Sequence, residues 1–253
     1  MTVVALGLAL VIGLTLGLFG GGGSILTVPV FVYALGIDPK LAIAMSFPVV
    51  GATSLVGAVG HWRAGNVRLT GALLFGLVAM TGSFAGARAS VLVSGRVQLL
   101  ILGVVMAAAA VLMLRSASRD AATAATAAAP RAPSRALYLV ALAVGGLTGL
   151  IGIGGGFLIV PALVLFGQMP MREAVGTSLL VIAMNSVSGF AGQRNTGAIP
   201  WRDVITFTAF TMGGILVGAR FAGSVPQRML KQGFAVLLLV IAVLVFWQNY
   251  SRL

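Results

Sequence analysis

The chain has 253 residues, of which 59% are hydrophobic and 8% are charged, with 35 glycines, no cysteine and a net charge of +12. Soluble domains carry about a quarter charged residues, so this composition excludes an ordinary soluble domain and indicates an integral membrane protein. The lack of cysteine excludes disulfides, thiol catalysis and cysteine metal sites. The basic residues are scattered over connectors without interleaved aromatics, which indicates positive-inside anchoring and no nucleic-acid partner.

Apolar runs follow one another along the whole chain. Each approaches or exceeds the roughly 17 to 25 residues that span a bilayer as a helix, and none alternates as a membrane strand does. We therefore predict an all-α protein that crosses the cell membrane several times. The runs are 2–19, 41–60, 69–93, 97–114, 136–151, 174–193, 204–226 and 232–248. The first run lacks a basic n-region and a cleavage site, which favours a retained helix over a signal peptide.

The chain contains two similar halves. Placing Pro29 over Pro161 sets a shift of 132 residues, and this register continues without a gap. It superposes several further residues, among them Gly22 on Gly154, Gly23 on Gly155, Ser46 on Ser178, Ser54 on Ser186, and Gly86-Ala87-Arg88 on Gly218-Ala219-Arg220. We predict a duplication with halves 1–114 and 136–253. The linker 115–135 is low in complexity and carries four arginines, which places it in the cytoplasm.

Residues 2–36 determine how the halves are related. As one straight helix they would extend about 52 Å, too long for a single crossing of a hydrocarbon core of about 30 Å. A hairpin broken at the glycines gives five segments per half and an inverted repeat. A single crossing with an overhang gives four segments and a parallel repeat. The connector charges fit both, and we favour inversion because Ile25 to Gly36 suit a half-depth arm.

Glycine runs interrupt corresponding places in the two halves, at residues 20–23 and 152–156. Such paired interruptions mark binding sites in duplicated transporters, because a broken helix leaves backbone groups to be completed. Half-helix N-termini there would offer free N–H groups to an anion. The predicted binding residues are Gly22, Gly23, Ser24, Gly154, Gly155 and Gly156. The alternative is close helix crossing, which is favoured for Gly82, Gly86, Gly214 and Gly218.

Both interrupted segments carry a family resemblance. GLFGGGGSILTVPVFVYALG and GLIGIGGGFLIVPALVLFG, with AVGTSL at 174–179, are similar to the two signature repeats of the TauE/SafE-type sulfite exporter family. The resemblance covers almost the whole chain outside the linker. It implies transport of sulfite, organosulfonates and related sulfur-containing or organic anions. The first repeat departs from the family in reading AMSFPV at 44–49 where GTSL is usual, and GGGG where GIGGG is usual.

Polar residues inside the apolar runs are further candidates. Arg88 and Arg220 occupy equivalent places with no acidic partner in their helices, so they either hold an oxyanion or snorkel to the interface. The hydroxyls of Ser46, Thr177, Ser178 and Ser186 could donate to substrate oxygens, although such groups often bond to their own helix. Asn185 is costlier to bury unpaired.

The remaining titratable residues point to an anion. His61 offers proton coupling or is an interfacial residue. No carboxylate lies in the middle of an apolar run, which argues against a cation substrate and against an enzyme. GIGGGF lacks the final glycine of a nucleotide motif, and no cofactor is predicted. We predict a secondary transporter of small anions that works by alternating access, with an anion pore as the alternative. A coupling proton and a homodimer stay open as partners beside the substrate and the lipid bilayer.

Overall fold

The computed structural model describes residues 3–122, 135–151, 156–193, 199–222 and 224–250. All regular elements in these ranges are helical, which confirms the all-α prediction. The α-helices are α1 (Val3–Phe19), α2 (Gly22–Pro29), α3 (Pro39–Arg63), α4 (Leu69–Ala89), α5 (Gly95–Ala122), α6 (Arg135–Ile151), α7 (Gly156–Leu165), α8 (Met171–Gly192), α9 (Trp201–Ala222) and α10 (Gln227–Tyr250). A π-helical turn, Val30–Ala34, continues α2, and a 3-10 turn, Ser90–Leu92, follows α4.

The first helix is broken at the glycine run. It ends at Phe19, and Gly20 takes a left-handed conformation with φ +70°, which a residue with a side chain rarely adopts. Helix α2 then doubles back, so that Gly23 lies against Ile12 and Leu16 of α1. The segment is therefore a hairpin and not one straight helix. In the second half α6 ends at Ile151 and α7 begins at Gly156, while the predicted break between them lies outside the described residues.

The first helix of each half packs against a helix of the other half. Helix α1 packs along α9, where Gly13 lies against Thr211 and Gly17 against Ala219. Helix α4 packs along α6 in the same way. Backbones meet directly in both pairs, because a Cβ on the contact glycines would overlap carbonyl groups of the neighbouring helix. This confirms the packing interpretation of Gly82, Gly86, Gly214 and Gly218.

The two central helices, α3 and α8, cross in opposite directions. Gly51 lies against Ser186, Gly57 against Leu179, and His61 against Gly176. Position numbers therefore rise along α3 as they fall along α8. These helices are superposed by the 132-residue shift, so their geometry is that of an inverted arrangement. That the halves arose by duplication stays an inference from the sequence.

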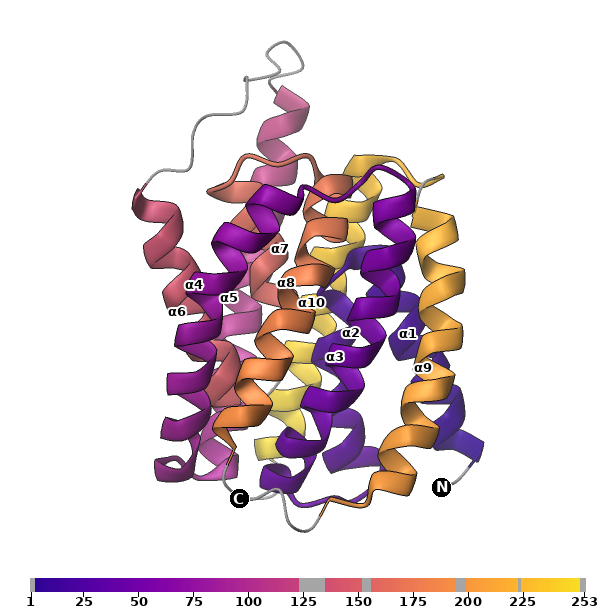
Figure 1. Cartoon of the computed structure of the whole chain (residues 1–253), viewed down its shortest axis with the longest axis vertical. Helices are drawn as coiled ribbons and strands as arrows, with labels where there is room; N and C mark the ends of the chain where they lie inside the picture. The colour runs from indigo at the N-terminus through magenta and orange to yellow at the C-terminus, as the bar shows by residue number, and fades with distance from the viewer. Residues whose placement is uncertain (1–2, 123–134, 152–155, 194–198, 223, 251–253) are drawn as a thin grey trace.

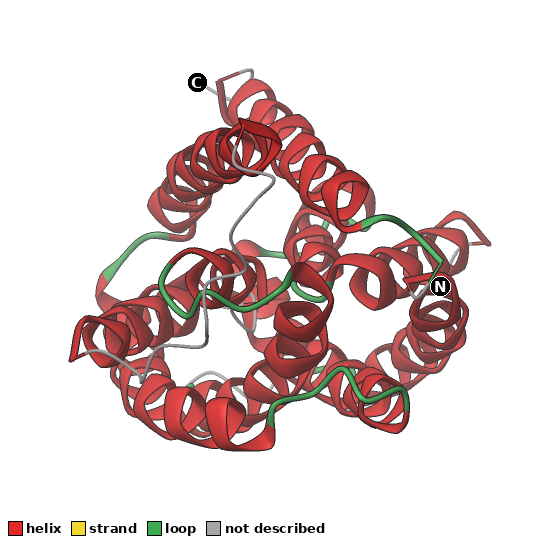
Figure 2. Ribbon diagram, turned by 90° about the horizontal axis from the view of Figure 1, so that it is seen from above, coloured by secondary structure: helices red, strands yellow, loops and turns green. Residues whose placement is uncertain are grey.

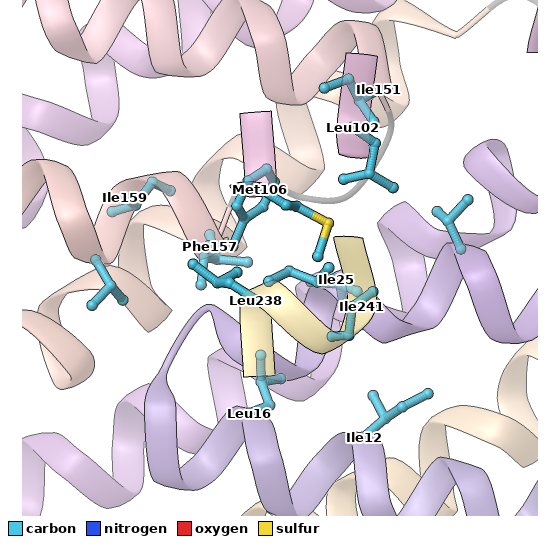
Figure 3. Close-up of a cluster of buried hydrophobic side chains, with 14 of the residues drawn as sticks. Ile12, Leu16, Ile25, Leu102, Met106, Ile151, Phe157, Ile159, Leu238 and Ile241 are labelled. Carbon is cyan, nitrogen blue, oxygen red and sulfur yellow. The ribbon is translucent and has the colours of Figure 1, made fainter. Parts of the chain in front are cut away.

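Apolar side chains fill the centre of the bundle. The short helices α2 and α7 contact each other there and are flanked by α5 and α10 (Figure 1). Seen from above, helices lie on all sides of the centre of the bundle (Figure 2). Figure 3 shows Ile25 of α2 and Phe157 of α7 in one cluster with Met106 and Leu238, all of them fully buried. Burial of a large apolar side chain contributes about 1.5 to 3 kcal/mol in water, and here it mainly fixes the packing.

The outer surface suits a bilayer. Large apolar side chains such as Leu77, Leu139, Val187 and Trp247 are well exposed around the bundle. Six of the described helices are long and apolar enough to cross a membrane. Helix α3 begins where the Asp38 carboxylate accepts hydrogen bonds from the N–H groups of residues 40 and 41. The α3–α4 connector lies at the end of the bundle where α5 ends, which we term the linker end (Figure 1).

Candidate functional site

Two polar stripes, one on α3 and one on α8, run through the crossing of these helices. On α8, Ser178 and Asn185 are seven positions apart and so share one face of the helix, and Ser186 lies next to them. The corresponding residues of α3 are Ser46, Thr53 and Ser54. All six side chains are at most 2% exposed. The crossing thus places two matched polar stripes inside an otherwise apolar bundle.

Three of these side chains have no hydrogen-bond partner among the residues that the structure describes. They are Ser54 through Oγ, Ser186 through Oγ, and Asn185 through both Oδ1 and Nδ2. An unsatisfied buried polar group costs about 1 to 3 kcal/mol, so four such atoms on the two crossing helices are unfavourable unless a bound molecule pairs with them. We term Ser54, Asn185 and Ser186 the crossing cluster. It can supply two hydroxyl donors and one amide donor to a bound molecule.

The other serine hydroxyls of the stripes are occupied within their own helices. Ser46 donates to the carbonyl of Ile43, and Ser178 donates to that of Val175. Ser178 also touches the first break, since a Cβ on Gly20 would lie 2.7 Å from its Oγ. The fold therefore brings the first glycine break into contact with the stripe of α8.

The first glycine run is closely packed. Gly23 allows α1 and α2 to cross, because a Cβ there would lie 2.6 Å from the backbone nitrogen of Leu16. Ser24 is buried and donates to the carbonyl of Gly21. Packing is a sufficient reason for Gly23, and a role of Gly22, Gly23 and Ser24 in binding stays a prediction. Gly154 and Gly155 lie outside the described residues, and Gly156 is the first residue of α7.

Thr177 connects two helices at the linker end. Its Oγ1 accepts a 3.0 Å hydrogen bond from the backbone N–H of Arg68, which is the N-cap residue of α4. The Arg68 guanidinium also forms a salt bridge with Glu173 in the first turn of α8. Thr177 therefore has a structural partner and lies apart from the crossing cluster.

The two candidate arginines lie at opposite ends of the bundle. Arg88 is exposed in the last turn of α4, where its guanidinium stacks 5.0 Å from the ring centre of Phe84. Arg220 is exposed in the last turn of α9, at the linker end. The structure does not bring either arginine to the crossing cluster or to the other arginine, and their place agrees with the snorkelling alternative.

An apolar groove opens beside the crossing cluster on the outer face of α3 and α8. Its volume is about 500 Å³, and its walls include Pro48 and Leu55 of α3 with Leu180 and Val187 of α8. Those two pairs are related by the 132-residue shift. Ser186 lines the groove, so one member of the cluster borders this space.

Sequence reasoning missed part of this arrangement. Ser54 carries a signal that could have been used, because the shift places it over Ser186 in the middle of an apolar run. A second signal lies at the helix ends, where the shift places Gln193 over His61. His61 is 3% exposed and its Nε2 lies 3.1 Å from the carbonyl oxygen of Gly17, a contact between residues 44 positions apart.

The apolar surface, the long helices and the buried polar crossing define a multi-pass α-helical membrane protein with features of a transporter. Comparison with known proteins gives its family: residues 5–245 match the family model described as sulfite exporter TauE/SafE. The chain belongs to this family, and its relatives are membrane transporters and not enzymes.

Curated relatives cover nearly the whole chain. A probable membrane transporter protein of Xylella fastidiosa (strain 9a5c) is 33% identical over 99% of this chain and 97% of its own length. The probable membrane transporter protein YdhB of Bacillus subtilis is 29% identical over 87% of this chain and 90% of its own length. A probable membrane transporter protein of Haemophilus influenzae is 26% identical over 92% and 94%. No solved structure matches the chain.

Proposed function

We propose that this transporter carries a small sulfur-containing or organic anion, sulfite or an organosulfonate, and binds it at the crossing cluster. The observation that carries the proposal is the set of four unpartnered polar atoms on Ser54, Asn185 and Ser186. An anion with several oxygens would accept from the two hydroxyls and the amide, and would remove the cost of their burial.

The charge around the cluster also favours an anion. Helix α3 contains no carboxylate, and in α8 the single carboxylate is Glu173, which is paired with Arg68 in the first turn. A cation in this part of the bundle would therefore find no opposite charge on either helix. Neutral donors can hold an anion and still release it, which a transport cycle requires.

We further propose alternating access as the mechanism. The opposite directions of α3 and α8 support it, since inverted repeats can exchange conformations and so open a central site to either side in turn. The crossing cluster lies where these two helices meet. The first glycine break contacts Ser178 of α8 and would let α2 move with the substrate.

Uptake by proteoliposomes tests the proposal. Labelled sulfite and a small labelled alkylsulfonate should enter vesicles that contain the protein, and Asn185→Leu should reduce uptake at least tenfold. Leucine has the same number of side-chain heavy atoms as asparagine and needs no partner, so we expect the variant to remain folded. Val187→Ala, on the outer wall of the groove, is the control that should retain uptake.

Three outcomes would contradict the proposal. Unchanged uptake in Asn185→Leu would exclude the crossing cluster as the binding site. Uptake that only equilibrates the anion, with no accumulation under any imposed ion gradient, would favour the pore over the secondary transporter. Concentrative uptake of a cation in place of the anions would overturn the substrate class.

A further inference from the structure

Corresponding side chains at the two ends of the bundle are in different hydrogen-bonding states. At the linker end, His61 Nε2 donates to the carbonyl of Gly17, since a carbonyl can only accept. Gly17 is among the last four residues of α1, whose carbonyls have no partner within the helix. His61 therefore holds the end of α3 against the end of α1, just before the first glycine break.

The equivalent residue at the opposite end of the bundle, Gln193, does not form the corresponding hydrogen bond. Gln193 follows α8 directly and corresponds to His61 under the 132-residue shift, yet its buried Nε2 has no hydrogen-bond partner within the described part of the chain. The carbonyl of Leu150, near the end of α6, is held instead by Gln98 Nε2 at 2.8 Å. Gln98 is 1% exposed, and its own Oε1 is likewise unpartnered among the described residues.

Space for a rearrangement is present at this end. Gln193 and Gln98 both line a small cavity of about 10 Å³, together with Lys40 and Ser90. The unpartnered Nε2 of Gln193 and the unpartnered Oε1 of Gln98 border one cavity, so the two amides could exchange partners without a large change in packing. No such exchange is available at the position equivalent to Gln98 in the other half, where the residue is Leu230.

The helices on either side of these contacts differ in how firmly they are held. Helices α1 and α9 meet backbone to backbone, as do α4 and α6, so each pair is expected to move as one body. His61 joins α3 to the first pair. Gln193, at the end of α8, faces the equivalent junction with the second pair.

From this asymmetry we infer that His61 and Gln193 are reciprocal latches of the transport cycle. In the state seen here the His61 latch is closed on α1 and the Gln193 latch is open. In the opposite state Gln193 bonds to the end of α6 and His61 releases Gly17. The inference rests on the proposed alternating access, and it makes both residues positioning residues that never touch the substrate.

A cysteine reporter can test the inference, because the chain has no cysteine of its own. Ala58 is 5% exposed and lies one turn before His61 on the same face of α3. Ala58→Cys should react slowly with N-ethylmaleimide, at a rate set by how often the end of α3 leaves α1. One net hydrogen bond changes such an equilibrium about fivefold.

Removal of the two latches should change the labelling rate of Ala58→Cys in opposite directions. Adding His61→Ala to Ala58→Cys should raise the labelling rate about fivefold, because the closed state loses its bond. Adding Gln193→Ala should lower the rate about fivefold, because the opposite state loses its bond. The conservative variants His61→Gln and Gln193→His should stay near the parent rate, and Trp62→Ala, an exposed neighbour of His61, serves as the local control.

The effect of Gln193 is decisive, since this residue lies at the other end of the bundle and a local structural role would not reach Ala58. An unchanged labelling rate in Gln193→Ala overturns the inference, even where His61→Ala fails to fold. The measurement uses no substrate. It can therefore fail while anion uptake persists, and anion uptake can fail while the latches are found.

Discussion

The backbone N–H of Arg68 donates a 3.0 Å hydrogen bond to the hydroxyl of Thr177, a residue 109 positions further along the chain. The Arg68 side chain forms a salt bridge with Glu173 one turn earlier on α8. The start of α4 is thus capped by the other half of the molecule. Through this contact, Thr177 of the AVGTSL sequence has a structural role that does not depend on a substrate.

Replacing Thr177 should separate this purpose from binding. Thr177→Val keeps the shape of the side chain and removes the acceptor, so we expect a loss of about 1 to 2 kcal/mol in stability. Thr177→Ser retains the hydroxyl and should lose much less. Thermal unfolding of the purified protein in detergent measures the difference. Equal midpoints for the two variants would show that the bond does not stabilise the fold.

The glycine contact between α4 and α6 allows a closely matched comparison. A Cβ on Gly145 would overlap the carbonyl oxygen of Ala79, whereas a Cβ on Gly146 would meet its first neighbour at 3.9 Å. Gly145→Ala should therefore destabilise the protein by about 1 to 3 kcal/mol, while Gly146→Ala should be neutral or slightly stabilising. The midpoints of thermal unfolding check this, and similar midpoints would contradict backbone contact in this pair.

The conformation of Gly20 leads to a third prediction. Gly36 has nearly the same φ, +66°, but a methyl group added there would meet no described neighbour within 4 Å. Gly36→Ala therefore reports the backbone cost alone, about 1 kcal/mol. Gly20→Ala should cost about 1 to 3 kcal/mol more, because its methyl group would press on Ser178 and Val175.

A double-variant comparison checks the source of that extra cost. Gly20→Ala combined with Ser178→Ala should recover part of the stability that Gly20→Ala loses. No recovery would show that Ser178 does not limit the space at the break. The free energies of unfolding would come from the same thermal measurements.

Arg88 and Arg220 are expected to act at a distance from the crossing cluster. Neutralising either one, by Arg88→Gln or Arg220→Gln, should raise the KM for an anion a few-fold and leave the maximal rate unchanged, since exposed charges attract ions without holding them. The difference from the parent should shrink as ionic strength rises from about 0.01 M to 0.15 M. A large fall in maximal rate would instead place an arginine in the binding site.

Much of the fold could be predicted from the sequence. The apolar runs predicted most of the long helices to within a few residues, because bilayer thickness limits length and turns need polar residues. The run at 97–114 departs further, since its helix extends over Gly95–Ala122 into the linker. The hairpin was favoured over a single crossing with an overhang because Ile25 to Gly36 suit a half-depth arm, and the structure has this hairpin from Val3 onward.

The site was less predictable, for a physical reason. A buried glycine looks the same in sequence whether it admits a ligand or a neighbouring helix, and Gly23 proves to face Leu16. Likewise, a hydroxyl in an apolar run gives no sign of its partner. Ser46 bonds to its own helix while Ser54 has no partner among the described residues, and these cases differ only in the direction of the side chain.

The pairing of α1 with α9 and of α4 with α6 has a consequence for biosynthesis. When the ribosome has completed only the first half, the glycine faces of α1 and α4 have no surface to meet, because both partners are still to be translated. Assembly must therefore wait until α9 has entered the bilayer. A truncated product that ends in the linker would leave these bare faces open to quality-control proteases.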